Sequence, residues 1–133
     1  MSATYVELSA GGLMAATGYY QMAPDQLEKY RTALLSEGGN IYGAELRSLF
    51  ADVGRAGCTV GGELLKTAPR GVSRTAENID LLRYKSVTVS ATLRINGGET
   101  LAQAETFVAK TWHVGQPVSN WLDQHVGAST LAP

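Results

Sequence analysis

The sequence predicts a single α+β domain, and three patterns carry that prediction. Residues 84–95, YKSVTVSATLRI, alternate strictly between apolar and polar side chains, which is typical of a half-buried β-strand. An N-terminal β-hairpin is predicted around Gly11-Gly12, and two α-helices are predicted between residues 100 and 127. With 133 residues, the chain is large enough to bury its own core as one domain, residues 1–133.

The N-terminal hairpin is predicted from two strand-like runs on either side of the glycine pair. In residues 3–9, ATYVELS, Tyr5 and Glu7 fall on one side, and Val6 and Leu8 fall on the other. A second β-capable run, LMAATGYYQM, follows the glycines. A short Gly-containing connection between two such runs favours antiparallel pairing.

The middle of the chain leaves two interpretations open. Residues 23–39, APDQLEKYRTALLSEGG, begin with a Pro-Asp helix start and end at two glycines, so helix is favoured there over a strand at 27–35. Residues 40–53 fit either a helix or a strand. If they form a strand, the GRAG turn at 54–57 would join them to 58–69 as a hairpin. Residues 70–80 are polar and are predicted to form a loop or a single helical turn.

Two amphipathic helices are predicted to close the chain. Thr100 and Gln103 have the spacing of a capping box, and an apolar stripe follows at helical spacing. Gly115 is expected to end this helix and Pro117 to start the next, which would end at Gly127. The clear strand predicts two faces: Val87, Val89, Ala91, Leu93 and Ile95 on one, and Tyr84, Ser86, Thr88, Ser90, Thr92 and Arg94 on the other.

Composition narrows the function classes. Charged residues are only 17% of the chain and the net charge is −1, whereas a dedicated DNA-binding domain is usually strongly basic. So low a charge also indicates that some surface is buried against other copies. The lone Cys58 excludes an internal disulfide, and the two distant histidines make a metal site or cofactor unexpected.

Neither targeting nor catalytic motifs are evident. Residues 1–3 lack a basic leader region, and no apolar run approaches the roughly 18 residues of a membrane span, so we expect a soluble, intracellular or particle-borne protein with no membrane partner. His113 and His125 have no nucleophile at motif spacing, and no phosphate-binding Gly-Lys-Ser run occurs. We therefore predict that the protein is not an enzyme.

One alternative concerns residues 107–124, which could form a degenerate helix-turn-helix of a small phage or plasmid DNA-binding regulator. The motif fits poorly, because Gly115 lies about three residues later than the tight turn requires. The second helix would also offer no Lys or Arg to the DNA phosphates. Two amphipathic helices packed on a sheet or on a partner explain the same residues.

The order of these elements resembles the coat proteins of the single-stranded RNA bacteriophages, the leviviruses. Residues 86–127, SVTVSATLRINGGETLAQAETFVAKTWHVGQPVSNWLDQHVG, carry the resemblance, with a last strand, a polar turn, a long helix, a Gly-x-Pro break and a short helix. The opening residues, TYVELSAGGLMAATGYY, are similar to the hairpin of that family. Residues 24–80 depart from it, since they look more helical than its central strands.

The resemblance implies a capsid protein with an antiparallel five-stranded sheet beside the hairpin. Two subunits would form a homodimer, with the two C-terminal helices of each packing on the partner's sheet, and dimers would assemble into an icosahedral virion in the cytoplasm of a bacterial host. The expected dimer interface consists of Phe107, Val108, Trp112, Val118, Trp121 and Leu122.

The same resemblance implies single-stranded RNA as the second partner, bound on the inner face of the sheet. Hydroxyl groups can bond phosphate and the ribose 2′-OH, and a tyrosine can stack on an unpaired base. The expected RNA-binding residues are Tyr84, Ser86, Thr88 and Ser90 on the clear strand, with Arg47 and Lys66 as cationic candidates.

Overall fold

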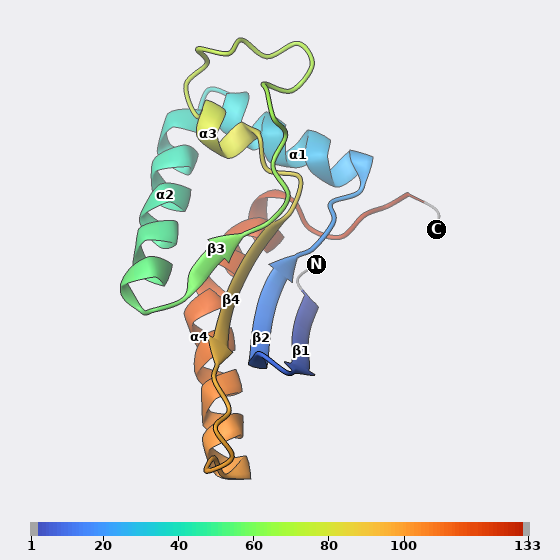
Figure 1. Ribbon diagram of the computed structural model, residues 1–133. Helices are drawn as coiled ribbons and strands as arrows, with labels where there is room; N and C mark the ends of the chain where they lie inside the picture. Colours follow the sequence, from blue (N-terminus) through green and yellow to red (C-terminus); the bar gives the residue numbers. More distant parts are fainter. Residues whose placement is uncertain (1–2, 132–133) are drawn as a thin grey trace.

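The computed structural model describes residues 3–131, which form an α+β fold (Figure 1). In chain order the elements are β1 (Ala3–Ser9), β2 (Gly12–Tyr19), α1 (Pro24–Leu35), α2 (Gly39–Arg55), β3 (Thr59–Gly61), α3 (Ile79–Leu82), β4 (Val87–Leu93) and α4 (Leu101–His125). Within the described residues the sheet has four antiparallel strands in the order β1-β2-β4-β3. The α+β class is thus confirmed, whereas the expectation of five strands is wrong.

The N-terminal hairpin forms as predicted. β1 and β2 pair in continuous register from Ala3 opposite Gly18 to Ser9 opposite Gly12. β2 pairs with β4 from Leu13 opposite Leu93 to Tyr19 opposite Val87, so the second strand of the hairpin and the last strand of the chain form the centre of the sheet. β4 spans residues 87–93, which is shorter at both ends than the alternating run of the sequence.

Helix α4 covers one face of the sheet by packing over β2 and β4. The strand side chains under it include Ala15, Tyr19, Val87 and Val89, all buried. Burying such side chains contributes on the order of 1.5–3 kcal/mol each for the larger ones. The alternation of β4 therefore predicted its covered face correctly at Val87 and Val89.

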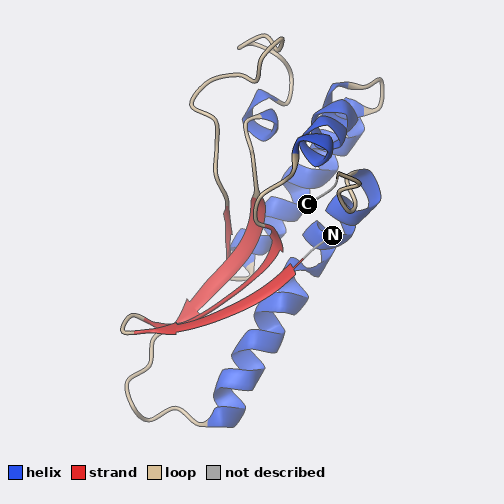
Figure 2. Cartoon of the chain, turned by 90° about the vertical axis from the view of Figure 1, so that its right-hand side faces the viewer, coloured by secondary structure: helices blue, strands red, loops and turns tan. Residues whose placement is uncertain are grey.

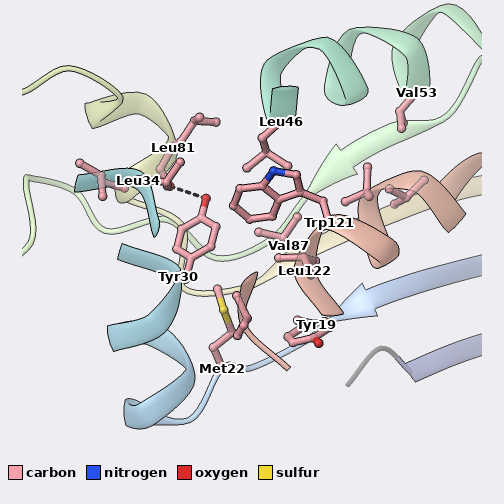
Figure 3. Packing of buried hydrophobic residues seen from close by; sticks show 14 residues of the cluster. Tyr19, Met22, Tyr30, Leu34, Leu46, Val53, Leu81, Val87, Trp121 and Leu122 are labelled. Atoms are coloured by element: carbon pink, nitrogen blue, oxygen red, sulfur yellow. Dashed lines mark hydrogen bonds between the residues drawn. The ribbon is translucent and has the colours of Figure 1, made fainter. Parts of the chain in front are cut away.

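A second part of the core lies where α1 and α2 meet the C-terminal half of α4 (Figure 3). Tyr30 of α1 and Trp121 of α4 make an edge-to-face contact, with their ring centroids 6.0 Å apart. The Tyr30 hydroxyl donates a 2.7 Å hydrogen bond to the carbonyl oxygen of Leu81. Leu46 of α2 is fully buried beside them, so three helices share one apolar cluster.

The structure resolves the two interpretations of the middle of the chain. Residues 24–35 are helical, as favoured, and residues 39–55 are helical too. The predicted hairpin between 40–53 and 58–69 is therefore wrong. Gly43, Leu46 and Val53 recur on the buried side of α2 at helical spacing, and that apolar stripe against α1 and α4 selects the helix.

The predicted two C-terminal helices are a single helix. The capping box at its start is confirmed, because Thr100 N–H donates to Gln103 Oε1 at 2.8 Å and Gln103 N–H donates to Thr100 Oγ1 at 3.1 Å. The helix then runs through Gly115 and Pro117 without a break. Residues 107–124 consequently contain no turn, and the two-helix arrangement that a helix-turn-helix needs is absent from them.

Half of the expected dimer-interface residues lie in the core of this subunit. Val118, Trp121 and Leu122 are at most 5% exposed and belong to the subunit's own core, so they have no surface left for a partner. α4 packs on its own sheet, and the expectation that these three side chains reach across to a partner's sheet is wrong. Phe107, Val108 and Trp112, nearer the start of α4, are only partly buried.

Candidate ligand-binding face of the sheet

The face of the sheet opposite α4 carries no helix among the described residues. Figure 2 views the molecule from the β1 side and shows the long helix α4 on one side of the strands. Side chains that alternate with the covered ones must point to the uncovered face. From β1, β2 and β4 these are Tyr5, Glu7, Met14, Ala16, Thr88, Ser90 and Thr92.

A hollow lies in this open face beside the small side chain of Ala16 on β2. Ala16 sits between Tyr5 on β1 and Ser90 on β4 in the strand register. Gly18, the next position on this face, has φ of 130°, and a Cβ there would strike the carbonyl oxygen of Val87. The hollow has a volume of about 430 Å³ and is lined by Tyr5, Met14, Ala16, Tyr20, Thr88 and Ser90. This volume lies within the roughly 300–1,000 Å³ range typical of small-molecule pockets.

The polar groups around the hollow are unevenly satisfied. The Tyr5 hydroxyl donates a 2.9 Å hydrogen bond to Glu7 Oε2. The Tyr20 hydroxyl is buried, and the described residues offer it no hydrogen-bond partner. The two tyrosine rings meet edge to face with centroids 6.1 Å apart. Burial, followed by the influence of Tyr5, raises the pKa of Tyr20, so its hydroxyl stays protonated and can donate at neutral pH.

Of the predicted RNA-binding residues on the clear strand, Thr88 and Ser90 line the hollow together. Ser86 is 5% exposed, and its Oγ accepts the N–H of Glu63 at 2.7 Å, so it holds the segment that follows β3. Tyr84 packs edge to face on Phe50 of α2, with centroids 5.8 Å apart. β4 begins only at Val87, after these two positions in the chain, which is why strict alternation misplaced them.

The two cationic candidates lie away from the hollow. Arg47 of α2 donates hydrogen bonds to both carboxylate oxygens of Asp80, at 3.0 and 2.6 Å. Lys66 is exposed in the connection between β3 and α3, residues 62–78. Arg70 and Arg74 are also exposed in this connection, and residues 64–76 contain no acidic side chain. Residues 64–76 are called the basic loop below.

Four lining residues, Tyr5, Met14, Ala16 and Tyr20, were not among the predicted site residues. The side of β1 that carries Tyr5 was visible in its alternation. Its position on the same open face as Thr88 and Ser90 of β4 was not visible, because that depends on β2 lying between β1 and β4. Only the pairing of β2 with both neighbours brings residues 5, 20 and 88 around one hollow.

Fold and face together define an α+β protein with a helix-covered sheet whose other face is open and hollowed. Residues 1–121 match the DUF2461 family, described as a conserved hypothetical protein, and the chain belongs to that family. This finding overturns the resemblance to levivirus coat proteins, and no viral family matches the chain. Comparison with curated proteins and with solved structures finds no match.

Two features of residues 3–131 concern membranes and metal ions. None of their helices combines the length and the apolar character needed to cross a membrane. They also contain no group of three or more His, Cys, Asp or Glu side chains placed to hold a metal ion.

Proposed function

We propose that this protein binds single-stranded RNA, with an unpaired base in the hollow of the open sheet face and the sugar-phosphate backbone running toward the basic loop. The observation that carries the proposal is the buried Tyr20 hydroxyl, for which the described residues offer no partner, in a residue that lines the hollow together with three further hydroxyl-bearing residues, Tyr5, Thr88 and Ser90. A buried donor without a partner costs on the order of 1–3 kcal/mol. A bound acceptor, such as a base carbonyl or ring nitrogen, would remove that cost.

The shape and chemistry of the hollow suit a planar, partly polar group. Tyr5, Met14 and Ala16 supply the apolar part of its lining. Stacking of a base on an aromatic ring contributes about 1–3 kcal/mol. Thr88 and Ser90 add hydroxyls that can bond a 2′-OH, the group that distinguishes RNA from DNA. A base can enter such a hollow only when it is unpaired, which favours single strands over duplexes.

The electrostatic contribution comes from the basic loop rather than from the sheet. Its exposed cations are Lys66, Arg70 and Arg74. The loop follows β3 and leads through α3 into β4, which carries Thr88 and Ser90 of the hollow. Three phosphate contacts predict a salt slope of only about −2 for a single strand. Binding should therefore depend on salt much less than it does for a strongly basic nucleic-acid-binding protein.

The direct test is fluorescence anisotropy with a labelled 12-nucleotide RNA, compared with the same sequence as single-stranded DNA, duplex RNA and duplex DNA. We expect the single-stranded RNA to bind most tightly. Tyr20→Phe removes one hydroxyl and should raise Kd about tenfold, since a hydrogen bond of this kind contributes on the order of 1 kcal/mol or more. Thr88→Ala and Ser90→Ala should each raise Kd severalfold.

A stability measurement separates a binding role of Tyr20 from a structural one. Because its hydroxyl has no partner in the described residues, Tyr20→Phe should leave the free energy of unfolding unchanged or raise it, even as RNA binding weakens. Gln116→Ala is the matched control. Gln116 bonds Asn120 on the exposed side of α4, away from the sheet, and its loss should change neither quantity.

Three results would refute the proposal. One is no measurable binding of any single strand at tens of micromolar protein. Another is RNA affinity unaffected by Tyr20→Phe, Thr88→Ala and Ser90→Ala together. The third is a preference for duplex DNA, which the alternative of a DNA-binding regulator requires.

A further inference from the structure

The outer edge of β1 has no strand beside it in the described chain. β1 is the first strand of the sheet order and pairs only with β2. All seven of its residues are exposed, including Val6 at 44% and Leu8 at 71%. An edge of this kind presents a row of unpaired backbone N–H and C=O groups.

The hairpin turn determines which backbone groups point outward. Ser9 and Gly12 are the last pair before a two-residue connection, so they must exchange hydrogen bonds directly. Bonded and non-bonded pairs alternate along an antiparallel ladder. The backbone groups of residues 3, 5, 7 and 9 therefore point to β2, and those of Thr4, Val6 and Leu8 point to the open edge.

This edge lacks the usual protection. Natural edge strands are commonly blocked by proline, lysine, a bulge or a covering segment. The sequence of β1, ATYVELS, has neither proline nor lysine, and its register with β2 has no bulge. Its one charged side chain, Glu7, already accepts a hydrogen bond from Tyr5. α4 packs on β2 and β4, so it leaves room beside β1.

We propose that β1 pairs with β1 of a second copy of this chain, antiparallel about a two-fold axis at Val6. The residues whose backbone groups point outward must lie opposite each other in the two strands. Near the middle of β1 this condition allows the two-fold axis to pass at Tyr5, Val6 or Glu7. An axis at Glu7 places two carboxylates directly opposite each other, which is destabilising. An axis at Tyr5 leaves Leu8 and Ser9 unpaired, whereas an axis at Val6 pairs all seven residues.

The Val6 register is also chemically self-complementary. It places Tyr5 opposite Glu7 of the partner subunit, so the hydroxyl-carboxylate bond now made within one strand can be made across the interface. It places Thr4 opposite the partner's Leu8. The product is a continuous eight-stranded sheet whose two open faces, each with its own hollow, lie side by side.

Disulfide trapping tests the proposed register of the two β1 strands directly. In a Cys58→Ser background, Val6→Cys should oxidise to a covalent dimer, because directly opposed bonded residues have Cα atoms about 5.5 Å apart, which suits a disulfide. Thr4→Cys alone should not cross-link, since its copy in the partner would lie four residues away along the strand, roughly 13 Å. An equal mixture of Thr4→Cys and Leu8→Cys proteins should cross-link as a heterodimer.

Light scattering on the full chain supplies the second measurement. The wild type should be a dimer at tens of micromolar, and Val6→Lys should convert it to a folded monomer, because two lysines would face each other at the axis. Ile41→Lys, the same kind of change at an apolar residue of α2 that is 65% exposed, should leave the dimer intact. A 14.1 kDa wild-type monomer, cross-linking strongest at Thr4→Cys alone, or a dimer unaffected by Val6→Lys would each overturn the proposal.

Discussion

Gly115 of α4 lies directly against Thr17 of β2, where a Cβ on the glycine would collide with the threonine methyl group and press on Val89. The glycine therefore marks the closest approach of helix and sheet rather than a helix end. Pro117, two residues later, sacrifices one backbone hydrogen bond inside the helix. Packing of Val118 and Leu122 beyond it holds the helix continuous.

This contact predicts opposite effects for two glycine substitutions. Gly115→Ala should lower the free energy of unfolding by about 1–3 kcal/mol, the usual range for overpacking. Gly54→Ala, in α2 with nothing within 4 Å of the added Cβ, should raise it by roughly 0.5–1 kcal/mol. Urea unfolding of the two variants checks both signs. Equal effects of the two variants would contradict the contact, and Thr17→Ser should partly restore the Gly115→Ala protein.

Of the polar side chains packed at the junction of α1 and α2, Asn78 is the one whose substitution is predicted to lower the free energy of unfolding most. Its backbone is left-handed, with φ of 65°, and its buried Nδ2 donates to the carbonyl oxygens of Leu34 at 3.2 Å and Gly39 at 2.9 Å. Asn78→Gly keeps the backbone allowed but leaves both carbonyls unpaired, which should cost on the order of 2–4 kcal/mol. Thermal unfolding measures this, and a Tm unchanged from the wild type would show that water satisfies the carbonyls instead.

The Arg47–Asp80 ion pair predicts a small, pH-dependent contribution to stability. The hydrogen bonds from Arg47 hold the pKa of Asp80 below its usual range. A lowered folded-state pKa stabilises above the unfolded value, about 3.9, and the contribution disappears as the pH falls through the folded value. Because both side chains are largely exposed, Asp80→Asn should cost less than about 1 kcal/mol at pH 7. Urea titrations from neutral to acid pH should show the two proteins converging, and a gap that widens in acid would contradict the sign.

Substitution of Trp121 tests whether this side chain belongs to the core of one subunit or to an interface between subunits. It is 5% exposed and packs on Tyr30 and His125 within the subunit. Trp121→Asp should cost at least the roughly 3–5 kcal/mol of a Trp→Ala change, and so abolish cooperative unfolding. In the monomeric Val6→Lys background the loss should be the same at every protein concentration, as circular dichroism across a dilution series would show. Recovery of the fold at high concentration would instead place Trp121 in an intersubunit contact.

Local rules in the sequence were sufficient where a segment makes its own structure. The hairpin of β1 and β2 follows from alternation around a short Gly-containing turn, and the start of α4 follows from the reciprocal bonds of Thr100 and Gln103. Alternation along β4 separated the covered Val87 and Val89 from the open Thr88 and Ser90. These predictions held because residues close in sequence determine them.

Tertiary packing selected the structure of those segments whose local sequence fits more than one. Residues 40–53 fit strand or helix, and the shared cluster of Leu46 with Tyr30 and Trp121 selects the helix. Gly115 and Pro117 look like a helix break in sequence, yet contacts with the sheet on one side and the core on the other outweigh one lost hydrogen bond. The hollow depends most on tertiary structure, since Tyr5, Tyr20 and Thr88 meet only when β2 lies between β1 and β4. The sequence by itself thus determined the α+β class, the hairpin and the faces of the central strand, because these are set by neighbours along the chain. Only the tertiary structure decided the continuity of α4 and the position of the site. Both depend on contacts between distant parts of the chain, such as the pairing of Leu13 with Leu93, 80 positions apart.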